Sequence, residues 1–189
     1  MKPERLAAFT DGVIAIIITI MVLELPTPRG TDLAAVRPVL PLLAAYLLAF
    51  VNVGIYWSNH HHMLQAAKKV NGQVLWANNA MLFCLSLVPF LIRWIGEEGV
   101  HPLPVAAYGL ILILSAIGYY VLERALIAAE GDQSKVKEAV GSKHKEWISI
   151  IGYGAAIGLA FVSPYIAIAI YVVVTALWLI PDRRFEFWR

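Results

Sequence analysis

The strongest constraint on the fold is an unbroken apolar segment near the start of the chain. Residues 12–23 contain a single polar side chain, Thr19. Together with residues 3–11 they make a helix of about 20 residues, the length that crosses the hydrocarbon core of a bilayer. Arg5 and Asp11 lie on the same segment. Ionisable groups are costly in a membrane and usually face protein or water, so this combination predicts a transmembrane helix that lines a pore.

The composition agrees with a membrane protein. The 189 residues are 60% apolar and 15% charged, with a mean hydropathy of +0.70. A soluble domain is closer to half apolar and a quarter charged. A net charge of +2 is too small to indicate a nucleic-acid partner. The single cysteine, Cys84, lies in an apolar run, which excludes a disulfide framework and a thiolate metal cluster.

Six membrane helices are predicted, in an all-α fold that forms one domain over residues 1–189. The last apolar region, 147–180, is too long for one crossing and divides at Ser163-Pro164, since serine favours the N-cap and proline the first helical position. The first segment is interpreted as retained, because no small-residue cleavage site follows it. The other predicted helices are 3–25, 36–58, 73–96 and 103–127.

Basic residues are distributed unevenly between the connections. With six spans, twelve of the fifteen Lys and Arg residues fall on one side of the membrane. By the positive-inside rule this side is cytoplasmic and holds both termini. Only three fall on the opposite side: Arg29, Arg37 and Arg93.

The first helix is predicted to have two kinds of face. At 100° per residue, one third of its circumference carries an apolar stripe with one glycine and one threonine. Asp11 and Thr10 point away from this stripe, to opposite flanks. The stripe consists of Arg5, Phe9, Gly12, Ile16, Thr19, Ile20 and Leu23.

A carboxylate two turns into a membrane helix needs a donor, and polar residues at the adjoining ends of the second and third helices can supply it. Such a network would fix the rotation of the first helix. Three consecutive histidines diverge by 100° on a helix, so they cannot converge on one metal ion. The candidate donors are His60, His61, His62, Trp76, Asn78 and Asn79.

The motif Arg5-x-x-x-Phe9-Thr10-Asp11-Gly12, followed by an aliphatic run with Thr19, resembles the first helix of the transmembrane protein 175 family. These proteins are potassium-permeable channels of prokaryotic membranes and of lysosomes. Trp57-x-x-His60, Trp76-Ala77-Asn78 and Val88-Pro89-Phe90 are similar to the second and third helices of that family. Leu91-Ile92-Arg93 departs from its pattern, where another proline and a threonine are expected.

The resemblance implies a homotetramer whose first helices line a central pore without a carbonyl filter. Ile16 is then the principal constriction, Ile20 and Leu23 are further apolar layers, and Thr19 discriminates between cations. It implies potassium ions and the lipid bilayer as partners, no cofactor, and no metal site beyond the permeant ion. The implied polar network joins Arg5, Phe9, Thr10 and Asp11 to His60, Trp76 and Asn78.

The resemblance implies a potassium leak channel in a prokaryotic plasma (inner) membrane, and physical reasoning from the residues agrees with weak selectivity. The chain has no Thr-Val-Gly-Tyr-Gly loop whose carbonyls could replace an ion's water shell, and a ring of isoleucines offers no ligands. Potassium sheds water more easily than sodium, so a modest preference is expected. A proton channel or proton-coupled carrier using Asp11 and His60 stays open, as does a structural membrane protein. An enzyme is disfavoured, since no nucleophile–base pair is visible.

Overall fold

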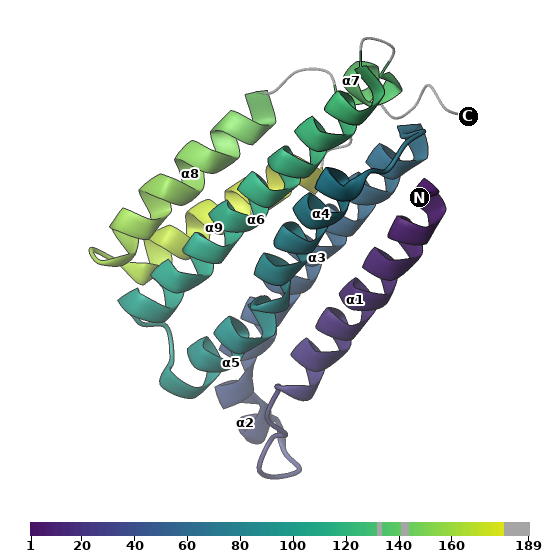
Figure 1. Ribbon diagram of the computed structural model, residues 1–189. Helices are drawn as coiled ribbons and strands as arrows, with labels where there is room; N and C mark the ends of the chain where they lie inside the picture. The colour runs from purple at the N-terminus through teal and green to yellow at the C-terminus, as the bar shows by residue number, and fades with distance from the viewer. Residues whose placement is uncertain (132–133, 141–143, 180–189) are drawn as a thin grey trace.

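Helices account for nearly all the regular structure, and they run back and forth along one common direction (Figure 1). This computed structural model describes residues 1–131, 134–140 and 144–179, and that part contains no strand. The segments are α1 (Pro3–Leu23), α2 (Leu33–Val36), a 3-10 turn (Arg37–Val39), α3 (Leu40–Ala66), α4 (Gly72–Ser86), α5 (Val88–Glu98), α6 (Pro102–Glu130), α7 (Lys135–Val140), α8 (His144–Ala160) and α9 (Pro164–Leu179).

Proline and glycine set the ends of the first and longest helices. Pro3 occupies the first turn of α1, where its missing N–H costs no hydrogen bond. Pro26 and Pro28 follow the end of α1 and prevent its continuation. Gly131, with φ of +71°, ends α6 in a conformation that residues with a Cβ rarely adopt.

Among the residues that the structure describes, four continuous helical stretches are long and apolar enough to cross a membrane: Pro3–Leu23, Leu33–Ala66, Gly72–Glu98 and Pro102–Glu130. The shorter α8 and α9 pack against each other and against α6. With these two, the helices form the predicted all-α membrane architecture. The division of the last apolar region is also confirmed, since α8 ends at Ala160 and α9 begins at Pro164.

Two predicted helices differ most from the structure, while the other predicted ends differ by up to four residues. The helix expected to end at residue 58 continues as α3 to Ala66, because the polar residues after 58 include no helix breaker. The helix expected over 73–96 is interrupted at Leu87 and resumes as α5. Pro89 explains this interruption, since it has no N–H to donate to the carbonyl four residues earlier.

The close contact between α4 and α6 depends on Gly118. A Cβ at Gly118 of α6 would lie 2.9 Å from the Met81 Cα of α4, closer than real Cβ contacts. Membrane helices commonly use small residues to bring their backbones this close. Met81 is fully buried at this crossing, so α4 and α6 form the centre of the bundle.

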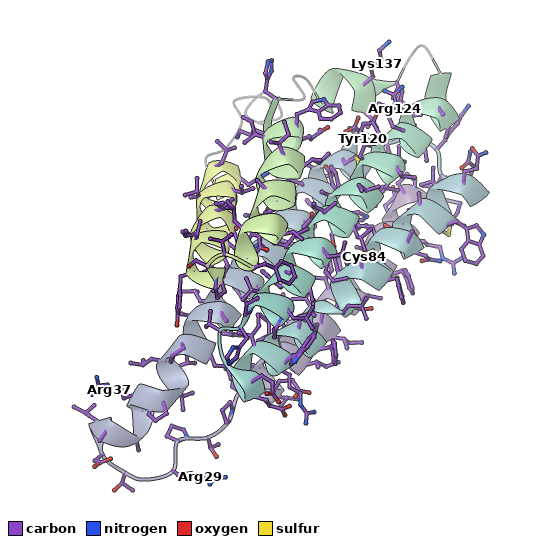
Figure 2. The ribbon with its side chains drawn as sticks, turned by 90° about the vertical axis from the view of Figure 1, so that its left-hand side faces the viewer. Arg29, Arg37, Cys84, Tyr120, Arg124 and Lys137 are labelled. Atoms are coloured by element: carbon purple, nitrogen blue, oxygen red, sulfur yellow. The ribbon has the colours of Figure 1, made fainter. Side chains whose placement is uncertain are left out.

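The two ends of the bundle carry different residues. Arg29 and Arg37 lie at one end, and Arg124 and Lys137 lie at the other (Figure 2). We call the end at which α1 stops at Leu23 the distal end, and the opposite end the N-terminal end. Helix α1 runs between them along the edge of the bundle and packs against α3, α4 and α5 (Figure 1).

Candidate functional site

Helix α1 presents one buried face and one exposed face. The buried side chains, all at most 3% exposed, are Leu6, Thr10, Ile14, Ile17 and Met21. The residues of the predicted stripe are all exposed in the single chain: Arg5, Phe9, Gly12, Ile16, Thr19, Ile20 and Leu23.

The angle between the two faces follows from the helix itself. At 100° per residue, the centre of the stripe lies about 130° from the centre of the buried face. The stripe therefore points away from α3, α4 and α5. Ile16, at 59% exposed, and Leu23, at 80%, are large apolar side chains that the rest of the chain leaves uncovered.

The one hydroxyl on the stripe is oriented by its own helix. The Thr19 hydroxyl donates to the Ile16 carbonyl at 2.9 Å. Its proton is thus directed at the backbone, while the oxygen lone pairs remain available on the exposed side. This arrangement offers an oxygen ligand, and not a donor, to whatever lies against the stripe.

A buried polar network attaches α1 to the bundle near the N-terminal end. The Asn78 amide nitrogen donates to the Thr10 hydroxyl at 3.0 Å. The Asn78 amide oxygen lies 2.8 Å from His60 Nε2. An amide oxygen can only accept, so Nε2 carries the proton of this contact. All three side chains are at most 1% exposed, and they join α1, α3 and α4.

Asp11 has a different partner from those considered in the sequence. The Trp57 indole nitrogen donates to Asp11 Oδ1 at 2.8 Å, on the exposed flank of α1. The His61 ring stacks on Trp57 with the ring centroids 5.9 Å apart, and His61 Nε2 lies 2.9 Å from Gln65 Nε2. The sequence singles out Trp57 only through its place in a motif, because no spacing along the chain links it to Asp11.

The structure does not bring the remaining candidates into this network. Trp76 is 76% exposed and Phe9 is 54% exposed. Among the described residues, no hydrogen bond or ion pair is recorded for the side chains of Arg5, Trp76 or Asn79. The same part of the chain contains no group of three or more His, Cys, Asp or Glu residues placed to hold a metal ion.

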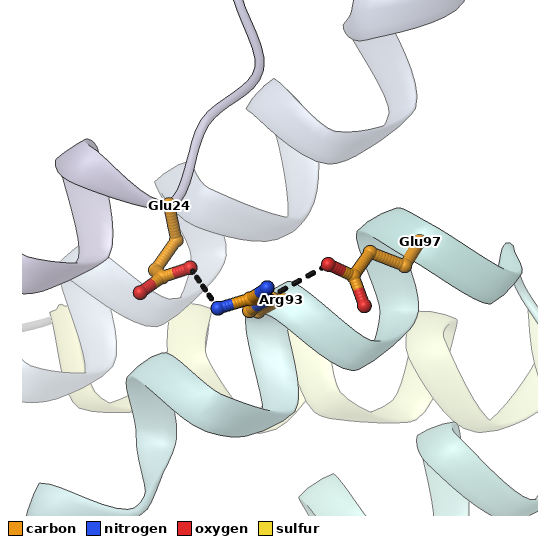
Figure 3. A network of polar contacts seen from close by, with 3 residues as sticks. All are labelled: Glu24, Arg93 and Glu97. Carbon is orange, nitrogen blue, oxygen red and sulfur yellow. Dashed lines mark hydrogen bonds and ion pairs between the residues drawn. The ribbon is translucent and has the colours of Figure 1, made fainter.

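A second polar contact, unforeseen in the sequence, lies at the distal end. Arg93 of α5 is 3.4 Å from Glu24, the residue that follows α1, and its Nε donates to Glu97 at 2.8 Å (Figure 3). The spacing of four residues between Arg93 and Glu97 is the helical signal for such a pair. Glu24 is 69 residues away in the chain, so only the fold reveals it.

These features define a class: a helical integral membrane protein with one helix at the edge of its bundle that is anchored by polar contacts and exposes an aliphatic stripe. Comparison with known proteins then gives the family. Residues 5–89 match the family described as "Endosomal/lysosomal potassium channel TMEM175".

Full-length relatives extend this match over the whole chain. A potassium channel of Chryseobacterium sp. (strain P1-3) is 55% identical over 98% of this chain and 97% of its own. A potassium channel of Streptomyces collinus is 27% identical over 87% of this chain and 85% of its own. The crystal structure of "a lysosomal potassium-selective channel TMEM175 homolog from Chamaesiphon Minutus" has a TM-score of 0.74 and 25% identity, covering 94% of this chain and 96% of that one. The chain belongs to the TMEM175 potassium channel family.

Proposed function

We propose that this chain is the subunit of a homotetrameric potassium leak channel in a prokaryotic inner membrane, with α1 lining a pore that has no carbonyl filter. The observation that carries the proposal is the exposed aliphatic stripe of α1. It lies on the helix at the edge of the bundle, while the opposite face of the same helix is buried. Membership of a potassium channel family supports the choice of ion.

An oligomer follows from the position of α1. One helix cannot enclose a water-filled path, so copies of α1 have to meet around an axis. Closed cyclic symmetry would bring the same stripe from each copy to that axis. The stripe would then cease to be an exposed surface and become the wall of the pore.

The stripe would act as a hydrophobic constriction. Ile16 would form the narrowest ring, with Ile20 and Leu23 forming further rings toward the distal end. Such rings supply no ligands, so an ion passes hydrated or loses water at a cost, and a narrow ring can close by dewetting. Thr19, between the rings of Ile16 and Ile20, would supply the oxygen that discriminates between cations.

The buried network would set the rotation of the pore helix. Thr10 is tied to Asn78, which is tied to His60. A rotation of α1 would break the Thr10–Asn78 contact and turn Ile16 away from the axis. In the proposed orientation the N-terminal end, with the more numerous cationic residues, faces the cytoplasm.

The decisive experiment replaces the constriction with a polar side chain. Ile16→Asn should increase potassium flux into liposomes that contain the purified channel, because a hydrated ring lowers the energy barrier to ion passage. It should also reduce the preference of the channel for potassium over sodium. Ile151→Asn is the matched control: Ile151 is 68% exposed and lies on α8, away from the stripe. Unchanged flux in Ile16→Asn, or an equal increase in the control, would contradict the proposal.

A proton pathway using Asp11 and His60 is the second candidate. His60 is 1% exposed and bonded to Asn78, and neither it nor Asp11 lies on the stripe. This placement favours a structural role for both residues. Proton uptake driven by a pH gradient in liposomes free of potassium would favour the second candidate, especially if Asp11→Asn abolished it.

A further inference from the structure

We propose that Arg93 is a positioning residue for permeation, which holds the distal end of the pore helix in place through its ion pair with Glu24. This inference rests on the proposed function, because it assigns a role to the distal end of α1 in the pore. It concerns a contact at the opposite end of α1 from the Thr10–Asn78–His60 network.

The distal end of α1 has little other support. Met21 is the last fully buried residue of the helix, and Leu23 is 80% exposed. Residues 26–32 are all exposed and form no helix, so the connection that follows cannot brace α1. The last turn of the pore helix therefore depends on Met21, on Leu25, which is partly buried against the core, and on whatever holds Glu24.

Glu24 is joined to that last turn by backbone hydrogen bonds. Its backbone N–H donates to the Ile20 carbonyl at 3.1 Å, and the next N–H, of Leu25, donates to the Val22 carbonyl at 3.2 Å. A restraint on the Glu24 side chain is therefore passed to Ile20 and Leu23 through short covalent and hydrogen-bonded connections. These two residues form the proposed distal rings of the pore.

Arg93 lies on α5, a helix that is packed tightly into the core. The side chains of Leu91, Ile92 and Ile95 on α5 are buried in the core. At Gly96, a Cβ would lie 2.6 Å from Leu42 Cδ2, so α5 is in close contact with α3 at this level. Helix α5 can thus serve as the reference against which the end of α1 is held.

The geometry of the network makes the ion pair more than an incidental surface contact. Isolated surface pairs contribute little, partly because two long side chains must be ordered to form them. Arg93 is already held by Glu97 on its own helix, at 2.8 Å, so pairing with Glu24 requires less additional ordering (Figure 3). In an assembly of several subunits, every copy contains the same ion pair.

The test separates a positional role from a simple effect of charge at the pore mouth. Glu24→Gln and Arg93→Gln both remove the ion pair between the two residues, but they change the net charge in opposite directions. Glu98→Gln is the matched control, since it makes the same charge change as Glu24→Gln at the exposed end of α5. Potassium and sodium permeability are measured in liposomes for each variant that keeps the oligomeric state of the parent protein.

We expect Glu24→Gln and Arg93→Gln each to reduce the potassium preference by about twofold, the size of a weak ion pair repeated around the pore. The double variant should equal either single variant, and Glu98→Gln should match the parent. Opposite effects of Glu24→Gln and Arg93→Gln, with Glu98→Gln following Glu24→Gln, would overturn the proposal in favour of mouth charge. Such a charge effect would also fade at 1 M salt, where the Debye length is about 3 Å.

A structural measurement distinguishes failure of this inference from failure of the proposed function. Amide hydrogen exchange at residues 22–25 should be faster in Arg93→Gln than in Glu98→Gln. Unchanged amide hydrogen exchange would show that Arg93 does not hold the end of α1, even if Ile16→Asn behaves as a pore mutation. Faster exchange with unchanged selectivity would refute its role in permeation. Failure of Ile16→Asn to alter flux would count against the pore itself.

Discussion

The side-chain amide of Asn78 donates a hydrogen bond of 3.0 Å to the hydroxyl of Thr10, in a position where neither side chain touches solvent. The two residues are 68 positions apart, and the contact joins α1 to α4. His60 of α3 completes the contact through the amide oxygen. The side chain of Asn78 therefore connects α1 to both α3 and α4.

Removing the Thr10 hydroxyl should destabilise the protein without touching the pore surface. In Thr10→Val the side chain keeps its shape, while the Asn78 amide loses its buried acceptor. Hydrogen bonds between membrane helices are worth about 0.6 kcal/mol on average, and an unsatisfied buried donor costs about 1–3 kcal/mol. We expect a loss of about 1–2 kcal/mol, measured as a lower midpoint of thermal unfolding in detergent.

Thr19→Val is the natural control for that experiment. It removes the same hydroxyl from the same helix, but from the exposed stripe, where the group bonds only to its own backbone. Its thermal midpoint should remain close to that of the parent protein. Equal destabilisation by the two substitutions would mean that the Thr10–Asn78 contact has no special weight.

The same Thr19→Val variant should alter selectivity. If the Thr19 oxygen faces permeating cations, its replacement by a methyl group removes the only oxygen ligand among the apolar rings. A lost interaction of about 1 kcal/mol corresponds to about a fivefold change in the potassium-to-sodium permeability ratio. Bi-ionic reversal potentials would measure that ratio. An unchanged ratio would show that Thr19 does not face the ion path.

The stripe on α1 could be predicted from the sequence because it depends on helical periodicity alone. Ile16, Ile20 and Leu23 share a face in any helix, and the structure leaves that face uncovered. The break at Ser163-Pro164 could be predicted for another local reason, since serine favours the N-cap and proline the first helical position. The break before Pro89 was missed because its hydrophobic run continues on both sides.

Contacts between distant positions were harder to foresee. The sequence predicts a donor to Asp11 at the adjoining ends of the second and third predicted helices, rather than Trp57, which donates in the structure. It could not distinguish Trp57 from His60 or Trp76, because the choice depends on the rotation of α3 against α1. The pairing of Arg93 with Glu24 likewise depends on how α5 leaves α4 at Pro89, which no local pattern specifies.

Packing at Gly118 gives a prediction that is independent of the pore. In Gly118→Ala the added methyl group would lie 2.9 Å from the Met81 backbone, which cannot move aside as a flexible side chain can. Overpacking of this kind costs about 1–3 kcal/mol. We expect a lower thermal midpoint and less correctly assembled protein in size-exclusion chromatography.

Gly158→Ala supplies the comparison for Gly118→Ala. Gly158 lies in α8, and a Cβ there would have no neighbour within 4 Å. Alanine is favoured over glycine within a helix by roughly 1 kcal/mol, so this substitution should be neutral or stabilising. A similar loss of stability in both variants would indicate that helix flexibility, and not the contact with Met81, explains the effect.

The contact between Trp57 and Asp11 allows the geometry of Asp11 to be separated from its charge. Asp11→Asn retains an oxygen that can accept from the indole N–H, whereas Asp11→Ala removes it. Because the contact is exposed, its loss should cost about 1 kcal/mol or less. We therefore expect potassium flux to change little in Asp11→Asn, and to change to a similar extent in Asp11→Ala and Trp57→Phe, both of which break the bond.

The double variant Asp11→Ala/Trp57→Phe decides whether these two residues act as a pair. If their shared hydrogen bond is what positions the flank of α1, the second substitution removes nothing further and the double variant matches either single one. Additive effects would show that the residues act separately. If Asp11→Asn were as damaging as Asp11→Ala, the negative charge itself would be required, and that result would favour the proton pathway over a purely structural role for Asp11.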